Sequence, residues 1–126
     1  MKAIVRTKYG SPDGLQLRNM EKPTPRDNEV LVKIQAACVN QYDWHLLTAD
    51  IALVRLMGGA FFKPKNKIPG ADIAGRVEAV GNNVKQFQPG DEVFGDIGHG
   101  GFAEYACARE DLFVLKPASM SFEQAA

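Results

Sequence analysis

The segment from Ile68 to Gly95, IPGADIAGRVEAVGNNVKQFQPGDEVFG, constrains the fold more than any other part of the chain. From Ala74 to Val80, small or apolar residues alternate with charged ones, which is the period-2 pattern of a half-buried strand. Residues that favour tight turns follow at Gly81–Asn83 and again at Pro89–Asp91. The segment therefore predicts a compact, turn-rich β domain.

The same patterns along the rest of the chain predict a mainly β fold. Each predicted strand is an extended or alternating run, and turn-forming residues separate most of these runs. The predicted strands are Lys2–Thr7, Leu15–Met20, Glu29–Ala37, Ile73–Val80, Glu92–Phe94, Phe102–Ala108 and Leu112–Lys116. Their number and spacing favour a barrel-like β fold.

Two parts of the chain have a helical pattern instead. Between Gln41 and Ile68, apolar residues recur at helical spacings, so we expect a short helical insert that packs over the mouth of the barrel. These residues include Trp44, Leu47, Ile51, Val54 and Met57. Near the carboxyl end, Ser121 and Gln124 have the spacing of a capping box, which predicts a helix that starts there. Because only two residues follow Gln124, we expect this chain to be part of a longer protein.

Composition excludes several classes of function. The 126 residues, 45% of them hydrophobic, suit one globular domain. Fifteen basic and fifteen acidic residues cancel, which argues against a nucleic-acid or anionic-membrane partner. No apolar stretch approaches the roughly 20 residues of a membrane helix and no signal peptide is recognisable, so we expect a cytoplasmic protein. Cys38 and Cys107 lack the spacing of a zinc motif, which favours buried, reduced thiols.

Several motifs, in their order and spacing, resemble one known family. They include the Ile68–Gly95 segment and, elsewhere, Lys2–Val5, Gly14–Leu17, Glu29–Ile34, Cys38–Trp44 and Gly100–Tyr105. Together they resemble the N-terminal, GroES-like catalytic domain of the medium-chain dehydrogenase/reductase superfamily. The segment CVNQYDW at Cys38–Trp44 is similar to the zinc-independent, quinone oxidoreductase-like branch. The resemblance implies a GroES-like partly open β-barrel.

The resemblance also implies chemistry without zinc. Zinc dehydrogenases of the superfamily have a cysteine at the position of Asn40 and a His-Glu pair at the positions of Ala71 and Asp72. A catalytic zinc needs three converging N, S or O ligands, and the side chain of Ala71 offers none. His45 and His99 have no cysteine or carboxylate at ligand spacing. We therefore predict that the protein holds no zinc.

Four residues in one segment are candidates for catalysis. The resemblance places Asn40 beside the nicotinamide end of a cofactor, where its amide could donate and accept hydrogen bonds; binding of turn backbone is the alternative. Asp43 is expected either to orient neighbouring groups or to cap a helix that runs from Trp44. Tyr42 and His45 are candidate proton relays, with packing at the barrel edge as the alternative.

Apolar side chains near these candidates would form the wall of a substrate pocket, although core packing explains them equally well. They are Trp44, Met57, Phe61 and Phe62. The implied cofactor is NADPH or NADH, and the implied substrate is a quinone or an enone.

The domain organisation follows from the same resemblance. Residues 1–126 would form a GroES-like substrate-side domain, and a Rossmann nucleotide-binding domain is expected after residue 126. Alone, these residues are expected to be inactive, and the parent protein is expected to be homodimeric. Two alternatives stay open. One is a free-standing binding or scaffold module with the same fold, and the other is a regulatory, non-catalytic parent protein.

Overall fold

A computed structural model describes residues 1–48 and 66–126 of the chain. Several predicted residues lie outside this description. They are the helical residues Ile51 and Val54, the pocket residues Phe61 and Phe62, and Met57, which was predicted in both roles.

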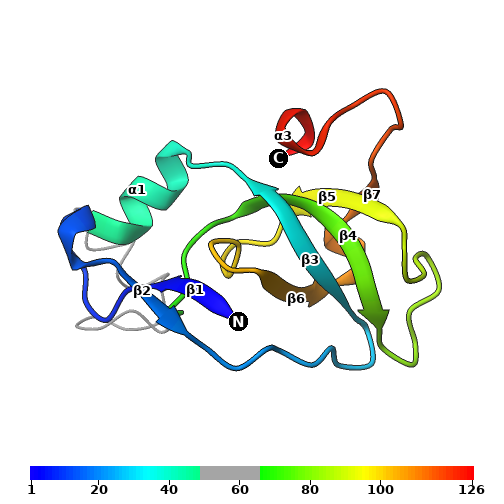
Figure 1. The fold of residues 1–126 in the computed structure, drawn as a ribbon, viewed down its shortest axis with the longest axis horizontal. Coiled ribbons are helices and arrows are strands. Elements are labelled where there is room, and N and C mark those ends of the chain that lie inside the picture. The colour runs from blue at the N-terminus through cyan, green and yellow to red at the C-terminus, as the bar shows by residue number, and fades with distance from the viewer. Residues whose placement is uncertain (49–65) are drawn as a thin grey trace.

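Within the described residues, the strands form two antiparallel sheets (Figure 1). The small sheet pairs β1 (Lys2–Val5) with β2 (Gln16–Asn19). The large sheet has the order β6-β3-β4-β5-β7. Its strands are β3 (Glu29–Ala37), β4 (Asp72–Val80), β5 (Glu92–Asp96), β6 (Tyr105–Arg109) and β7 (Val114–Leu115). An isolated bridge between Ala3 and Ala103 connects β1 to the segment that leads into β6.

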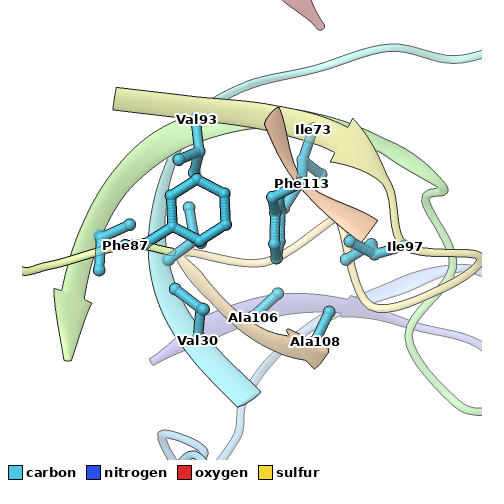
Figure 2. Close-up of a cluster of buried hydrophobic side chains, with 10 residues drawn as sticks. Val30, Ile73, Phe87, Val93, Ile97, Ala106, Ala108 and Phe113 are labelled. Atoms are coloured by element: carbon cyan, nitrogen blue, oxygen red, sulfur yellow. The ribbon is translucent and has the colours of Figure 1, made fainter. Parts of the chain in front are cut away.

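The strands of the large sheet surround the hydrophobic core (Figure 2), and β6 and β7 are its two edge strands among the described residues. Two register shifts between β3 and β4 interrupt the ladder, and irregularities of this kind bend a sheet and increase its twist. Figure 2 shows the aromatic rings of Phe87 and Phe113 pointing into the enclosed space among aliphatic side chains. The core consists of Val30, Val32, Ile73, Val77, Phe87, Val93, Ile97, Ala106, Ala108 and Phe113. This arrangement is the mainly β, partly open barrel that the sequence predicts.

All seven predicted strands are present, and most differences concern their ends. β3 has the predicted bounds. The last two strands are shorter or shifted: β6 begins at Tyr105 instead of Phe102, because the backbone at residues 102–104 bonds to β1. A 3-10 turn occupies Glu110–Leu112, so β7 begins at Val114 instead of Leu112.

Helix α1 (Gln41–Thr48) follows β3, and the short helix α3 (Phe122–Ala125) contacts β3 and β4. The predicted capping box of α3 is confirmed, since Ser121 and Gln124 bond to each other's backbone N–H groups at 3.1 and 2.9 Å. In Figure 1, α3 lies beside the end of β3 and the beginning of β4.

One buried lysine holds the segment that leads to α3. The side chain of Lys116 is only 5% exposed, and its Nζ lies 2.9 Å from the carboxylate of Glu92. The same ammonium donates to the carbonyls of Pro117 and Met120 and lies 5.1 Å from the centre of the Phe122 ring. The hydrogen bond from Lys116 to Glu92 is the main cause that lowers the pKa of Glu92. Lys116 thus fixes the path of the chain between β7 and α3.

Candidate functional site

Asn40 is the N-cap of α1. Its side-chain Oδ1 accepts hydrogen bonds from the backbone N–H groups of Tyr42 at 2.9 Å and Asp43 at 3.2 Å. In return, Oδ2 of Asp43 accepts from the backbone N–H of Asn40 at 3.1 Å. This reciprocal pattern is a capping box, with an Asn–Asp pair in place of Ser and Glu. The expectation that Asp43 caps a helix from Trp44 is therefore wrong: the helix begins at Gln41 and Asn40 caps it.

The amide of Asn40 also reaches across to β4. Its Nδ2 donates to Oδ2 of Asp72, the first residue of β4, 32 positions along the chain. A backbone hydrogen bond of 3.1 Å from the N–H of Cys38 to the carbonyl of Asp72 holds the two segments together. The fold therefore joins the Asn40 segment to the Ala71–Asp72 segment, the two places where the resemblance locates metal ligands in zinc dehydrogenases. Sequence reasoning did not identify Asp72 as a site residue.

Asp43 is a buried carboxyl group at the centre of this arrangement. The residue is 5% exposed. Burial raises the pKa of Asp43, and the nearby charge of Asp72 raises it further. Backbone N–H groups of Asn40, Ala71 and Gly70 favour the carboxylate and act in the opposite direction. The group is thus inclined to hold a proton more readily than an exposed aspartate.

A buried arginine holds the other end of α1. Arg6 is 2% exposed. Its Nη1 donates to the carbonyl of Leu46, and its Nε donates to the carbonyl of Asn66 at 3.2 Å. A cation at the carbonyl end of a helix also interacts favourably with the helix dipole. Burial lowers the pKa of Arg6, while the charges of Tyr9 and Asp43 oppose this effect. Arg6 is a second residue that the sequence patterns did not single out.

An apolar cavity of about 360 Å³ lies beside α1. Trp44, a predicted pocket residue, contributes to its wall, and Asp43 is the one ionisable group among the described residues that line it. The other described lining residues are Ile4, Pro12, Leu15, Ala37, Val39, Leu47, Pro69 and Phe102. A wall of this composition suits an uncharged, apolar ligand.

The two predicted proton relays occupy different surroundings. Tyr42 is 49% exposed on the first turn of α1, and neither it nor His45 is among the lining residues of the cavity. His45 is half-buried on the same helix. Their roles as relays stay predictions.

In residues 1–48 and 66–126, no three His, Cys, Asp or Glu side chains gather in a group that could hold a metal ion. Nor does any helix there have the length and apolar character needed to cross a membrane.

Comparison with known families identifies the domain. The alcohol dehydrogenase GroES-like domain matches residues 26–118. The chain belongs to this family. As an alcohol dehydrogenase GroES-like domain, it is a member of the medium-chain dehydrogenase/reductase superfamily, as the motifs predicted.

This GroES-like domain is similar in sequence to a quinone oxidoreductase and a furanone reductase. It is 37% identical to a quinone oxidoreductase of Sus scrofa and 39% identical to a 2-methylene-furan-3-one reductase of Solanum lycopersicum, in each case over the whole chain. It also resembles the crystal structure of Escherichia coli quinone oxidoreductase complexed with NADPH, with a TM-score of 0.84, 26% identity and 99% of the chain covered. The chain spans only 36%, 33% and 36% of the lengths of these three proteins.

Proposed function

We propose that this chain is the substrate-side domain of an NAD(P)H-dependent oxidoreductase that reduces quinones or activated C=C and C=O compounds without zinc. The similarity to named quinone and furanone reductases along the entire chain carries the proposal. Because the chain spans about a third of those relatives, we assign nucleotide binding to a further domain and expect residues 1–126 alone to be inactive. A cytoplasmic location and a homodimeric parent protein stay predictions.

The described residues fit such a role. NADPH or NADH, when bound, would supply a hydride to the acceptor. At the end of β3 and the beginning of β4, a half-buried amide at Asn40 offers a hydrogen-bond donor to an oxygen of such a ligand. Close by, the apolar cavity beside Trp44 offers space for an uncharged ring, and its walls would exclude water.

Reduction of a quinone or enone also requires a proton, and three side chains are candidates to hold it. Asp43 borders the cavity, and burial raises its pKa, so it keeps its proton to a higher pH than an exposed aspartate. Tyr42 and His45 lie on the same helix and keep their predicted role as relays. The position of Asp43 on the cavity wall favours it over the other two.

The test uses the complete protein encoded by the longest reading frame that contains these residues. NADPH oxidation is followed in the presence of an uncharged quinone, with and without a metal chelator, and residues 1–126 serve as the matched control. We expect turnover that the chelator does not change, and none from the control. Turnover that the chelator abolishes would contradict zinc independence, and a complete protein without NADPH-dependent turnover would refute the proposed function.

Variants then assign the proton. Asp43→Asn should lower kcat more than Tyr42→Phe or His45→Gln, because it removes the ionisable group on the cavity wall. An unchanged kcat in Asp43→Asn, together with a large loss of kcat in one of the other two variants, would assign the role of proton donor to the residue changed in that variant.

A further inference from the structure

Three of the four hydrogen-bonding positions of the Asn40 amide are already used within the protein. The two acceptor positions of Oδ1 receive the backbone N–H groups of Tyr42 and Asp43, at 2.9 and 3.2 Å. One N–H of Nδ2 is donated to the carboxylate of Asp72. These contacts also distinguish Oδ1 from Nδ2 in the Asn40 amide, because the oxygen must face the helix and the nitrogen must face the carboxylate.

We propose that Asp72 positions the side chain of Asn40, so that Asn40 meets a bound ligand only as a donor, through the second N–H of Nδ2. The nature of the ligand rests on the proposed function, in which it is a carbonyl or hydroxyl oxygen of the nicotinamide cofactor or of the acceptor. This differs from the sequence-based expectation that the amide both donates and accepts. The oxygen cannot accept from a ligand without releasing the first turn of α1.

Asp72 is well placed for this role. Its backbone is fixed on both sides, by pairing with Asp96 in β5 and by the 3.1 Å bond from the N–H of Cys38 to its carbonyl. Asn40 and Asp72 are both half-buried, so part of the pair stays accessible. A hydrogen bond to a carboxylate is stronger than one to a neutral acceptor, and it polarises the donor amide.

Two substitutions of Asp72 separate positioning from folding. Asp72→Ala removes the acceptor, whereas Asp72→Asn removes the charge and keeps an oxygen at the same place. Both leave the capping contacts of Asn40 with α1 untouched. In the chain of 126 residues, NMR can follow the two Nδ2 protons of Asn40 beside the backbone amide protons of Tyr42 and Asp43.

We expect one Nδ2 proton of Asn40 to be shifted downfield and protected from exchange. Asp72→Ala should abolish the shift and the protection, Asp72→Asn should restore protection in part, and the Tyr42 and Asp43 amides should not change. Nδ2 protons that behave alike in the wild type and in Asp72→Ala would overturn the positioning role. This measurement needs no activity, so it decides the role of Asp72 even if the proposed function fails.

Kinetics of the complete protein test the donor role. Asp72→Ala should lower kcat/KM by about tenfold or more, with rescue by Asp72→Asn. Asn40→Asp and Asn40→Ser both keep a good N-cap, but Asp presents an acceptor where the ligand needs a donor, and Ser retains a hydroxyl that can donate. To avoid two adjacent carboxylates, the comparison is made in the Asp72→Asn background, where Asn40→Asp should lose more kcat/KM than Asn40→Ser.

A rise in KM for NADPH would place the accepting oxygen on the cofactor, and a rise in KM for the quinone would place it on the acceptor. Wild-type kcat/KM in Asn40→Asp would overturn the donor role. A complete protein that folds and shows the predicted NMR pattern, but does not oxidise NADPH, would refute the proposed function and leave the positioning of Asn40 established.

Discussion

Substitution of Gly70 by alanine should destabilise the protein more than the same substitution at Gly90. Both glycines have nearly the same positive φ, +98° and +99°, which costs a residue with a side chain about 1–2 kcal/mol. A Cβ on Gly90 would have no atom within 4 Å, but one on Gly70 would lie 2.7 Å from the backbone nitrogen of Phe102. Overpacking of this kind typically adds about 1–3 kcal/mol. We therefore expect a loss of about 1–2 kcal/mol for Gly90→Ala and about 2–5 kcal/mol for Gly70→Ala.

Unfolding in guanidinium chloride, followed by far-UV circular dichroism and by the fluorescence of Trp44, the single tryptophan, measures both losses. Because the two φ angles match, the difference between the variants reports mainly on the contact with Phe102. Losses that agree within about 0.5 kcal/mol would refute the argument from this contact. Gly70 comes two residues before Asp72, so Gly70→Ala should also weaken the NMR signature of the Asn40 amide, which Gly90→Ala should leave unchanged.

Three further predictions follow from charges and thiols. Burial raises the pKa of Asp43 above its ordinary 3.8, so the folded state binds the proton of this carboxyl more tightly, and the contribution of Asp43 to stability should fall as the pH rises from that value. Denaturation at several pH values should show that the stability of the wild type relative to Asp43→Asn falls over the same range. Burial and the charge of Glu29 raise the pKa of Cys107 to about 11, so only about a thousandth of it is thiolate near pH 8. Mass spectrometry should find slow alkylation of Cys107 that denaturant accelerates. Lys116→Met removes the donor to the carbonyl of Met120, so hydrogen exchange should quicken in residues 117–125 and stay slow in β3.

Local patterns were sufficient to predict the strands because each strand carries its own signal. β3 and β4 are nine residues long, each with a run of three buried residues followed by an alternating part, and their bounds were predicted to within one residue. The largest error occurs where a distant partner decides the backbone. The predicted strand that begins at Phe102 starts later because residues 102–104 bond to β1, about a hundred positions earlier in the chain. Such a contact leaves no local mark in the sequence.

The site was predictable in part for the same reason. The segment from Asn40 to Trp44 was identified from its motif, and it does form the cap and first turn of α1. Capping of a helix from Trp44 was one expectation for Asp43, whereas Asn40, also a good N-cap residue, caps a helix that begins at Gln41. Asp72 was noted only because zinc dehydrogenases have a metal ligand at its position. Its partner Asn40 lies 32 residues away in the chain, so the contact leaves no local pattern. Arg6 follows an apolar strand and reads as a surface residue, yet its guanidinium is buried against the carbonyl end of the helix.

The double role of Asn40 determines how its contribution can be measured. Alanine at this position would remove a possible donor to the ligand and also the cap of α1, and loss of a cap alone typically costs about 1 kcal/mol. A displaced α1 would move Asp43 and Trp44, which form part of the cavity wall. Lost activity in Asn40→Ala would therefore not show that Asn40 contacts a ligand. Only substitutions that keep the cap, such as Asn40→Ser and Asn40→Asp, separate the donor from the helix it supports.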